Sequence, residues 1–356
     1  MITLKNVKTA AGDVVTHTIE SPLNHTIDGM GRLLMLPALV DVDSHYSNEE
    51  LVPHSERCIR SGISRLFDGR GKSPKELMAM TTPELIGPLS LFHYIDGSRT
   101  DEYDSIGRAK NKCIGIKANI DLGTSPATVQ QVSTLDRLFQ IAAQENLIVT
   151  LSLVQGKGSH KEQKEFAFST IVQAITLAEK YSNQLCLQHL RTAEEVTLIK
   201  EAKENGILVY GEIAYPHLFI HERSIEADHA AKMQYFLPTS QDQEALWKGI
   251  NDRTIDMIGS GNLLAPPELF LPLLMHAVKT NQLRLEVLSA ATRLNSESIF
   301  RLPPNKDIIL VDMETAEPFP QQLIEELHLS PEFKKLQLTG WTKFTIAHEQ
   351  LISSKG

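Results

Sequence analysis

The sequence is poor in cysteine and in long apolar stretches. Its three cysteines, Cys58, Cys113 and Cys186, have no paired spacing and lie in apolar settings, so we expect reduced thiols rather than disulfides. No run approaches the roughly 18 apolar residues of a membrane span. Residues 1–8 alternate like a strand and lack the apolar core of a signal peptide. We therefore expect a cytoplasmic protein that does not enter a membrane.

Long basic runs are absent too. The formal net charge is -9, so nucleic acid is not an expected partner. With 42% hydrophobic and 22% charged residues, the composition is that of an ordinary globular protein. The length of 356 residues suits one large α/β barrel with a small appended domain.

The middle of the chain alternates helical and strand patterns, without an internal repeat or a low-complexity segment. Thr192 and Glu195 form a capping box at the start of one helix, which Gly206 ends. Helices are predicted over 132–142, 166–181 and from 193 to 206, and strands over 147–154, 184–190 and 207–213. This βαβαβ order implies a parallel sheet.

Both ends of the chain contain short strand-like segments. Residues 1–36 hold several, separated by turn signals, and they are too few to bury a core alone. Residues 307–312 and 342–346 are strand-like as well. We therefore expect the two ends to meet in one small β-rich unit.

The most informative stretch is 36–47 (LPALVDVDSHYS), an apolar run that becomes polar at its end. It predicts a buried parallel strand whose carboxyl end opens into a site, as in α/β barrels. Asp43 and His45 are two residues apart, so on a strand both side chains point to the same face. They could converge on one ion or substrate. The alternative is a strand end with a solvated Asp and a structural His.

Several motifs resemble the dihydroorotase branch of the amidohydrolase superfamily. Residues 28–32 (DGMGR), followed by the strand at 36–41, resemble the opening of that family, and 115–117 (GIK) resembles its G-x-K. Residues 188–192 (QHLRT) and 212–218 (EIAYPHL) resemble its H-x-S-T and E-V-T-P-H-H-L segments, with the spacing preserved. The resemblance covers nearly the whole chain.

This resemblance implies an α/β fold of the amidohydrolase type. The expected parts are a (β/α)8 TIM barrel over residues 37–302 and a small β-sandwich domain built from residues 1–36 and 303–356.

The resemblance also implies roles for single residues. His45 and His189 stand at metal-ligand positions, and Lys117 stands where the family has a carboxylated lysine that bridges two metals. A free lysine, with a pKa near ~10.4, is a cation and cannot bind a metal ion, whereas its carbamate is an anionic ligand.

Other family positions have lost their chemistry. Asp43 replaces the first metal-binding His, and Ser152 stands at the position of another. Gly261 replaces the Asp that is both metal ligand and proton shuttle, so no catalytic residue is predicted. The positions that hold the substrate are changed as well, to Ser47, Gly71 and Pro238.

Two functions are consistent with this pattern. The first is a non-catalytic dihydroorotase homologue of pyrimidine biosynthesis, without a cofactor and forming a homo-oligomer. The resemblance implies a structural or regulatory role beside the aspartate transcarbamoylase catalytic subunit. The second is a cyclic amidohydrolase with a rebuilt site of at most one zinc ion on Asp43, His45 and carboxylated Lys117. Gly261 discriminates between them, because a rebuilt enzyme needs another base and the sequence offers no clear candidate.

The remnant metal site, Asp43, His45, Lys117 and His189, supports one geometric prediction. Without metals, Lys117 is an ordinary ammonium, and an unpaired charge at a barrel mouth is costly. We therefore expect an Asp43–Lys117 ion pair flanked by His45 and His189. The alternative is an Asp43 side chain that points to solvent.

Overall fold

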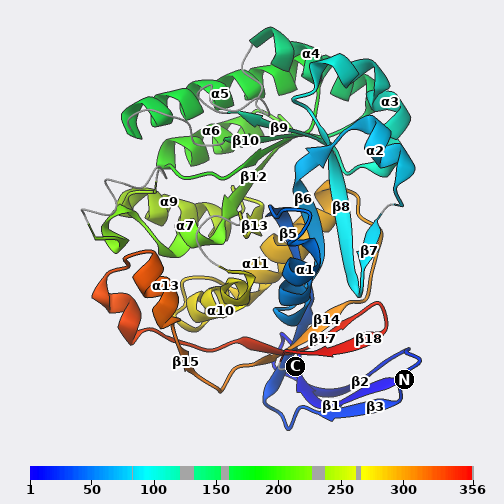
Figure 1. Cartoon of the computed structure of the whole chain (residues 1–356). Coiled ribbons are helices and arrows are strands. Elements are labelled where there is room, and N and C mark those ends of the chain that lie inside the picture. Colours follow the sequence, from blue (N-terminus) through cyan, green and yellow to red (C-terminus); the bar gives the residue numbers. More distant parts are fainter. Residues whose placement is uncertain (82, 121–131, 154–159, 227–236, 262–265, 355–356) are drawn as a thin grey trace.

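The computed structural model describes residues 1–81, 83–120, 132–153, 160–226, 237–261 and 266–354. Its centre is a barrel-like sheet of parallel strands with helices around it (Figure 1). In chain order the strands are β5 (Leu39–Ser44), β6 (Ile63–Lys72), β8 (Leu89–Asp96), β9 (Ile116–Ile120), β10 (Val149–Leu153), β11 (Leu185–Gln188), β12 (Val209–Ala214) and β13 (Met257–Gly259). β13 lies beside β5. The predicted α/β barrel is confirmed.

The strands of the barrel are buried on both faces. Every residue of β5, β10 and β11 is buried, because side chains on one face fill the barrel and those on the other pack under helices. This explains the continuous apolar runs that the sequence shows at these places.

Helices and short strands complete the barrel. The helices are α1 (Leu51–Arg60), α2 (Pro74–Ala79), α3 (Ile106–Ala109), α4 (Val132–Glu145), α5 (His160–Tyr181), α6 (Ala193–Glu204), α7 (Tyr215–Phe219), α9 (Ser240–Asn251), α10 (Phe270–Lys279), α11 (Leu285–Ser289), α12 (Asn295–Ile299) and α13 (Gln321–Glu326). The short strands are β7 (Glu84–Ile86), β15 (Glu317–Pro318) and β16 (Gln337–Leu338).

The start and the end of α6 follow the predicted signals. The Thr192 hydroxyl accepts a hydrogen bond from the Glu195 N–H at 3.2 Å, and the Glu195 carboxylate accepts one from the Thr192 N–H at 2.9 Å. Gly206 has a φ of 79°, a left-handed conformation that ends a helix at low cost for glycine. The capping box is confirmed.

Two strands are shorter than predicted. The strand expected over 147–154 spans Val149–Leu153, and the one over 184–190 spans Leu185–Gln188; position 154 lies outside the described residues. His189 has a φ of 61°, which strand geometry does not allow. The backbone therefore turns directly after Gln188.

The two ends of the chain meet in one mixed sheet at the foot of Figure 1. Its strands are β1 (Ile2–Lys8), β2 (Val14–Ile19), β3 (His25–Asp28), β4 (Leu33–Pro37), β14 (Ile308–Asp312), β17 (Trp341–Ala347) and β18 (Gln350–Ser353). Ile2 and Leu4 of β1 share a core with Leu310 and Ile346 of the C-terminal strands. The sheet therefore folds over itself and buries a core that neither end forms alone.

Two further expectations concern cysteines and membranes. Cys58, Cys113 and Cys186 are free thiols, as expected. Among the described residues, no helix has the length and apolar character needed to cross a bilayer.

Arg293 connects the barrel to the terminal sheet, and its replacement by methionine is expected to destabilise the protein. Its guanidinium is buried and donates to the carbonyls of Ala38 and Asp307 at 3.0 and 2.8 Å. Arg293→Met removes both hydrogen bonds and the ion pair of Arg293 with Glu297, so we expect a loss of about 3–5 kcal/mol in the free energy of unfolding by urea. Arg284→Met, at an exposed arginine, is the control, with a loss below about 1 kcal/mol. Equal losses would contradict the assigned role of Arg293.

Candidate functional site

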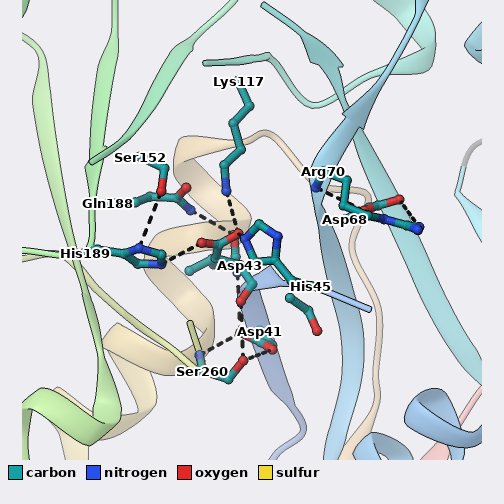
Figure 2. A network of polar contacts seen from close by, with 12 residues as sticks. Asp41, Asp43, His45, Asp68, Arg70, Lys117, Ser152, Gln188, His189 and Ser260 are labelled. Carbon is teal, nitrogen blue, oxygen red and sulfur yellow. Dashed lines mark hydrogen bonds and ion pairs between the residues drawn. The ribbon is translucent and has the colours of Figure 1, made fainter. Parts of the chain in front are cut away.

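The remnant metal-site residues converge at the carboxyl end of the barrel strands (Figure 2). Asp43 lies on β5 and Lys117 on β9. His45 follows β5, and His189 follows β11. Strands far apart in sequence place these four side chains together because their carboxyl ends share one face of a barrel.

The carboxylate of Asp43 is the centre of this group. Lys117 Nζ donates to Asp43 Oδ1 at 2.5 Å, and His45 Nε2 lies 3.1 Å from the same oxygen. His189 Nε2 lies 2.7 Å from Asp43 Oδ2. Asp43 and Lys117 are both almost inaccessible to solvent. The predicted ion pair, flanked by the two histidines, is confirmed, and Asp43 does not point to solvent.

Electrostatics keeps this carboxylate ionised. Burial alone would raise the pKa of Asp43, but the positive charge of Lys117 and the contacts with His45 and His189 outweigh it and hold that pKa well below its usual range. Burial lowers the pKa of His189. The two ring nitrogens of His189 face different groups: Nε2 lies 2.7 Å from Asp43 Oδ2 and Nδ1 lies 3.4 Å from the Ser152 hydroxyl.

A second set of buried groups fixes the strand ends. The Glu212 carboxylate accepts a hydrogen bond from the His189 backbone N–H at 2.9 Å, which holds the left-handed turn at this residue. Burial, with the nearby charge of Asp43, raises the pKa of Glu212 to about 8. Asp41 accepts hydrogen bonds from the Ser260 N–H and hydroxyl at 2.8 and 2.6 Å, and burial raises the pKa of Asp41 to about 6.

Gly261 directly follows Ser260, whose hydroxyl lies 3.3 Å from the Asp43 backbone carbonyl. The position is therefore next to the site, as the resemblance implies, but it carries no side chain that could bind a metal or a proton. Ser152, on β10, is buried, and its hydroxyl lies 3.4 Å from His189 Nδ1.

The positions expected to hold a substrate are occupied by other contacts. The Ser47 hydroxyl accepts the Glu50 N–H at 3.2 Å, and the Pro238 carbonyl accepts the Glu222 N–H at 3.0 Å. Gly71, on β6, has a φ of 74°.

Sequence reasoning missed two features of β6. Arg70 forms a two-pronged ion pair with Asp68, with distances of 2.9 and 3.0 Å, and its guanidinium lies 4.5 Å from the centre of the Tyr46 ring. At Gly69, a Cβ atom would collide with the Asp43 carboxylate and the His45 ring. The only sequence signal was the change at Gly71, one of the positions where the resemblance implies a substrate contact.

The donor set does not fit a two-metal centre. Metal ligands must offer lone pairs to the ion, whereas both oxygens of Asp43 face N–H groups of Lys117, His45 and His189. Lys117 as an ammonium offers no lone pair. Within the part of the chain that the structure describes, no three His, Cys, Asp or Glu side chains are arranged to hold a metal ion.

Sequence comparisons relate the chain to dihydroorotases. No protein-family model matches it. It is 24% identical over 353 residues to the multifunctional protein CAD of Squalus acanthias, which covers 91% of this chain and 15% of that protein. It is 29% identical over 212 residues to a dihydroorotase of Geobacillus sp., which covers 52% of this chain and 50% of that protein. The matches thus span half or less of these relatives.

Solved structures share the fold. The L-hydantoinase from Arthrobacter aurescens matches with a TM-score of 0.80 and 16% identity, over 100% of this chain and 96% of that one. The inactive dihydroorotase-like domain of the Chaetomium thermophilum CAD-like multifunctional protein matches with a TM-score of 0.68 and 18% identity, over 91% of this chain and 98% of that one. At these identities the likeness establishes the fold.

Replacing either member of the Asp43–Lys117 ion pair is expected to destabilise the protein, and the effects of the two replacements are expected not to add. Asp43→Asn leaves the Lys117 charge buried without its partner, so we expect a loss of about 3–5 kcal/mol in the free energy of unfolding by urea. Lys117→Met leaves the Asp43 charge buried without its lysine partner, so we expect a similar loss in the free energy of unfolding. The double variant Asp43→Asn/Lys117→Met should lose less than the sum of the two single changes.

The exposed pair of Asp136 with Lys180, at 2.7 Å, is the control. Asp136→Asn should lower the free energy of unfolding by less than about 1 kcal/mol. Additive losses at Asp43 and Lys117 would show that the two charges are not coupled.

Proposed function

Because this chain is a homologue of dihydroorotase and related cyclic amidohydrolases, we propose that it has lost cyclic amide hydrolysis. In this proposal it acts as a structural or regulatory partner of the aspartate transcarbamoylase catalytic subunit in pyrimidine biosynthesis. The observation that carries the proposal is the Asp43 carboxylate, whose two oxygens are occupied by Lys117, His45 and His189.

The missing chemistry supports the loss of activity. Metal-dependent hydrolysis needs an ion that polarises the carbonyl and supplies a hydroxide, and a group that moves the proton to the leaving nitrogen. Gly261 has no side chain for the second task. The Ser152 hydroxyl is a poor replacement for an imidazole ligand.

The comparisons support a role within an assembly. One relative is a multifunctional protein, of which this chain matches 15%. A structural neighbour is described as the inactive dihydroorotase-like domain of another such protein. A barrel that keeps its fold without its catalytic groups can still offer a surface to a partner.

The convergence of four side chains favours a second candidate. Asp43, His45 and Lys117 lie close enough to rebuild a single-metal site if Lys117 is carboxylated. Such an enzyme would bind one zinc ion and act on an altered cyclic amide or imide. Lys117 would then turn from a partner of Asp43 into an anionic ligand beside it.

Metal content and turnover separate these candidates. On protein purified without chelators, we expect less than one equivalent of zinc per chain by elemental analysis and no detectable dihydroorotate turnover. Loss of the proton-transferring group alone removes a factor of about 10²–10⁴ in rate. Gly261→Asp should not restore turnover, because the metal ligands and substrate anchors stay absent.

Two equivalents of zinc, or turnover by the unmodified chain, would refute the loss of activity. One equivalent of zinc that disappears in Lys117→Met, together with hydrolysis of a cyclic imide, would establish the second candidate instead.

The assembly role has its own test. The chain, mixed with the aspartate transcarbamoylase catalytic subunit of the same organism at micromolar concentration, should elute with it in size-exclusion chromatography. Bovine serum albumin in place of the chain is the control for non-specific association. Separate elution, with an unchanged transcarbamoylase rate, would contradict this partner.

A further inference from the structure

A cavity opens at the amino-terminal end of the barrel strands. Ile114, Ile148 and Gln184 line it, and they lie just before β9, β10 and β11. Its volume is about 460 Å³, within the range of small-molecule sites. Asp43 and its partners lie at the other end of the strands, where barrels place their catalytic groups (Figure 2). The cavity is therefore a separate site, and a ligand there acts by binding alone.

The inner wall of the cavity is apolar and is fixed by the barrel core. Phe300 lines the cavity, and its ring packs edge to face on the rings of Phe67 and Tyr94, with centroids 4.9 and 6.0 Å away. Ile148 belongs to the same buried cluster. Because the protein itself holds these side chains in place, a ligand does not have to order them when it binds.

The outer part of the cavity carries charges of both signs. Arg301 is exposed and lines the cavity, and its guanidinium forms no ion pair with any residue that the structure describes. Glu145 and Lys110 line the cavity as well, and they pair with each other at 3.0 Å. Arg301 is therefore available to an anionic group of a ligand.

Helix α4 ends at the same cavity. Glu145 is its last residue, and Asn146, which follows, has a φ of 55° and also lines the cavity. The last carbonyl groups of a helix lack partners within the helix, and this end of the helix dipole is negative. The Glu145 carboxylate adds a full negative charge there. This part of the cavity therefore favours the ammonium group of a ligand.

We propose that the cavity binds a free α-amino acid with an aromatic side chain. The carboxylate of this ligand pairs with the Arg301 guanidinium, whose fork of N–H groups matches a carboxylate. The ammonium group lies against Glu145 and the end of α4, and the aromatic ring lies against Phe300. A ligand of a single charge sign fits less well, because a phosphate also faces Glu145 and an amine also faces Arg301.

Cys113 allows occupancy of the cavity to be measured directly. It lines the cavity and is partly exposed, whereas Cys58 and Cys186 are fully buried. Burial raises the pKa of the Cys113 thiol to about 11, so its reaction with neutral iodoacetamide is slow enough to follow by mass spectrometry of peptides. At about 10 mM, L-phenylalanine with a Kd of about 1 mM or tighter should slow alkylation of Cys113 in the full chain at least about tenfold.

Two analogues test the need for both charges of the ligand. In isothermal titration calorimetry, 3-phenylpropanoate lacks the ammonium group of L-phenylalanine and phenethylamine lacks its carboxylate. Each should bind at least about tenfold more weakly than L-phenylalanine, because one charged contact is lost. Equal affinity of either analogue would overturn the assignment of an amino acid.

Two variants test the assigned contacts. Arg301→Gln and Glu145→Gln should each weaken binding of L-phenylalanine at least about tenfold, with an unchanged circular dichroism spectrum. Arg253→Gln is the matched control and should bind as the unmodified chain does. Arg253 is also exposed and stands two residues after the end of a helix, as Arg301 does. The φ values of 66° and 51° are similar, but Arg253 does not line the cavity.

No protection of Cys113 and no heat of binding with L-phenylalanine would overturn the proposal. Binding that persists unchanged in Arg301→Gln would overturn it as well, because the ligand would then lie elsewhere. These results do not depend on zinc content, turnover or the transcarbamoylase subunit, so this inference and the proposed function fail separately.

Discussion

The buried carboxylate of Asp43 is the constraint on which the barrel mouth depends. An ionised group that is fully removed from water is costly unless charges and hydrogen bonds compensate it. Lys117 supplies the opposite charge, and His45 and His189 supply further contacts. The residue types are mutually dependent: a lysine without metals needs an anion, and an aspartate at this depth needs a cation. The pair is therefore an internally neutral unit at the mouth of the barrel.

Two other buried carboxyl groups, Glu212 and Asp41, are stabilised in a different way. The pKa of Glu212 rises to about 8 because burial dominates it, so this group is mostly neutral at pH 7 and needs no counter-ion. Asp41 instead accepts two hydrogen bonds from Ser260. Lys117 lies against Asp43, the acid whose pKa is held low, whereas Glu212 and Asp41 have raised pKa values.

Much of this arrangement was predictable from sequence. Alternating patterns predicted the barrel, the Thr192 capping box predicted the start of α6, and family geometry predicted the contact between Asp43 and Lys117. Sequence patterns report structure only over short stretches of chain. They therefore did not predict the left-handed backbone at His189, because that turn is held by Glu212 from the next strand. The clearance at Gly69 was also missed, because the atoms that require it belong to another strand.

Stability alone is a sufficient reason for Lys117 and His189 to be present beside Asp43. Removal of either takes a contact from the buried Asp43 carboxylate, at a cost comparable to a large part of a domain's net stability. A lysine and two histidines at the mouth of a barrel therefore do not by themselves indicate metal binding. What distinguishes the two cases is what the carboxylate oxygens contact, and here those of Asp43 lie against Lys117 Nζ and His189 Nε2.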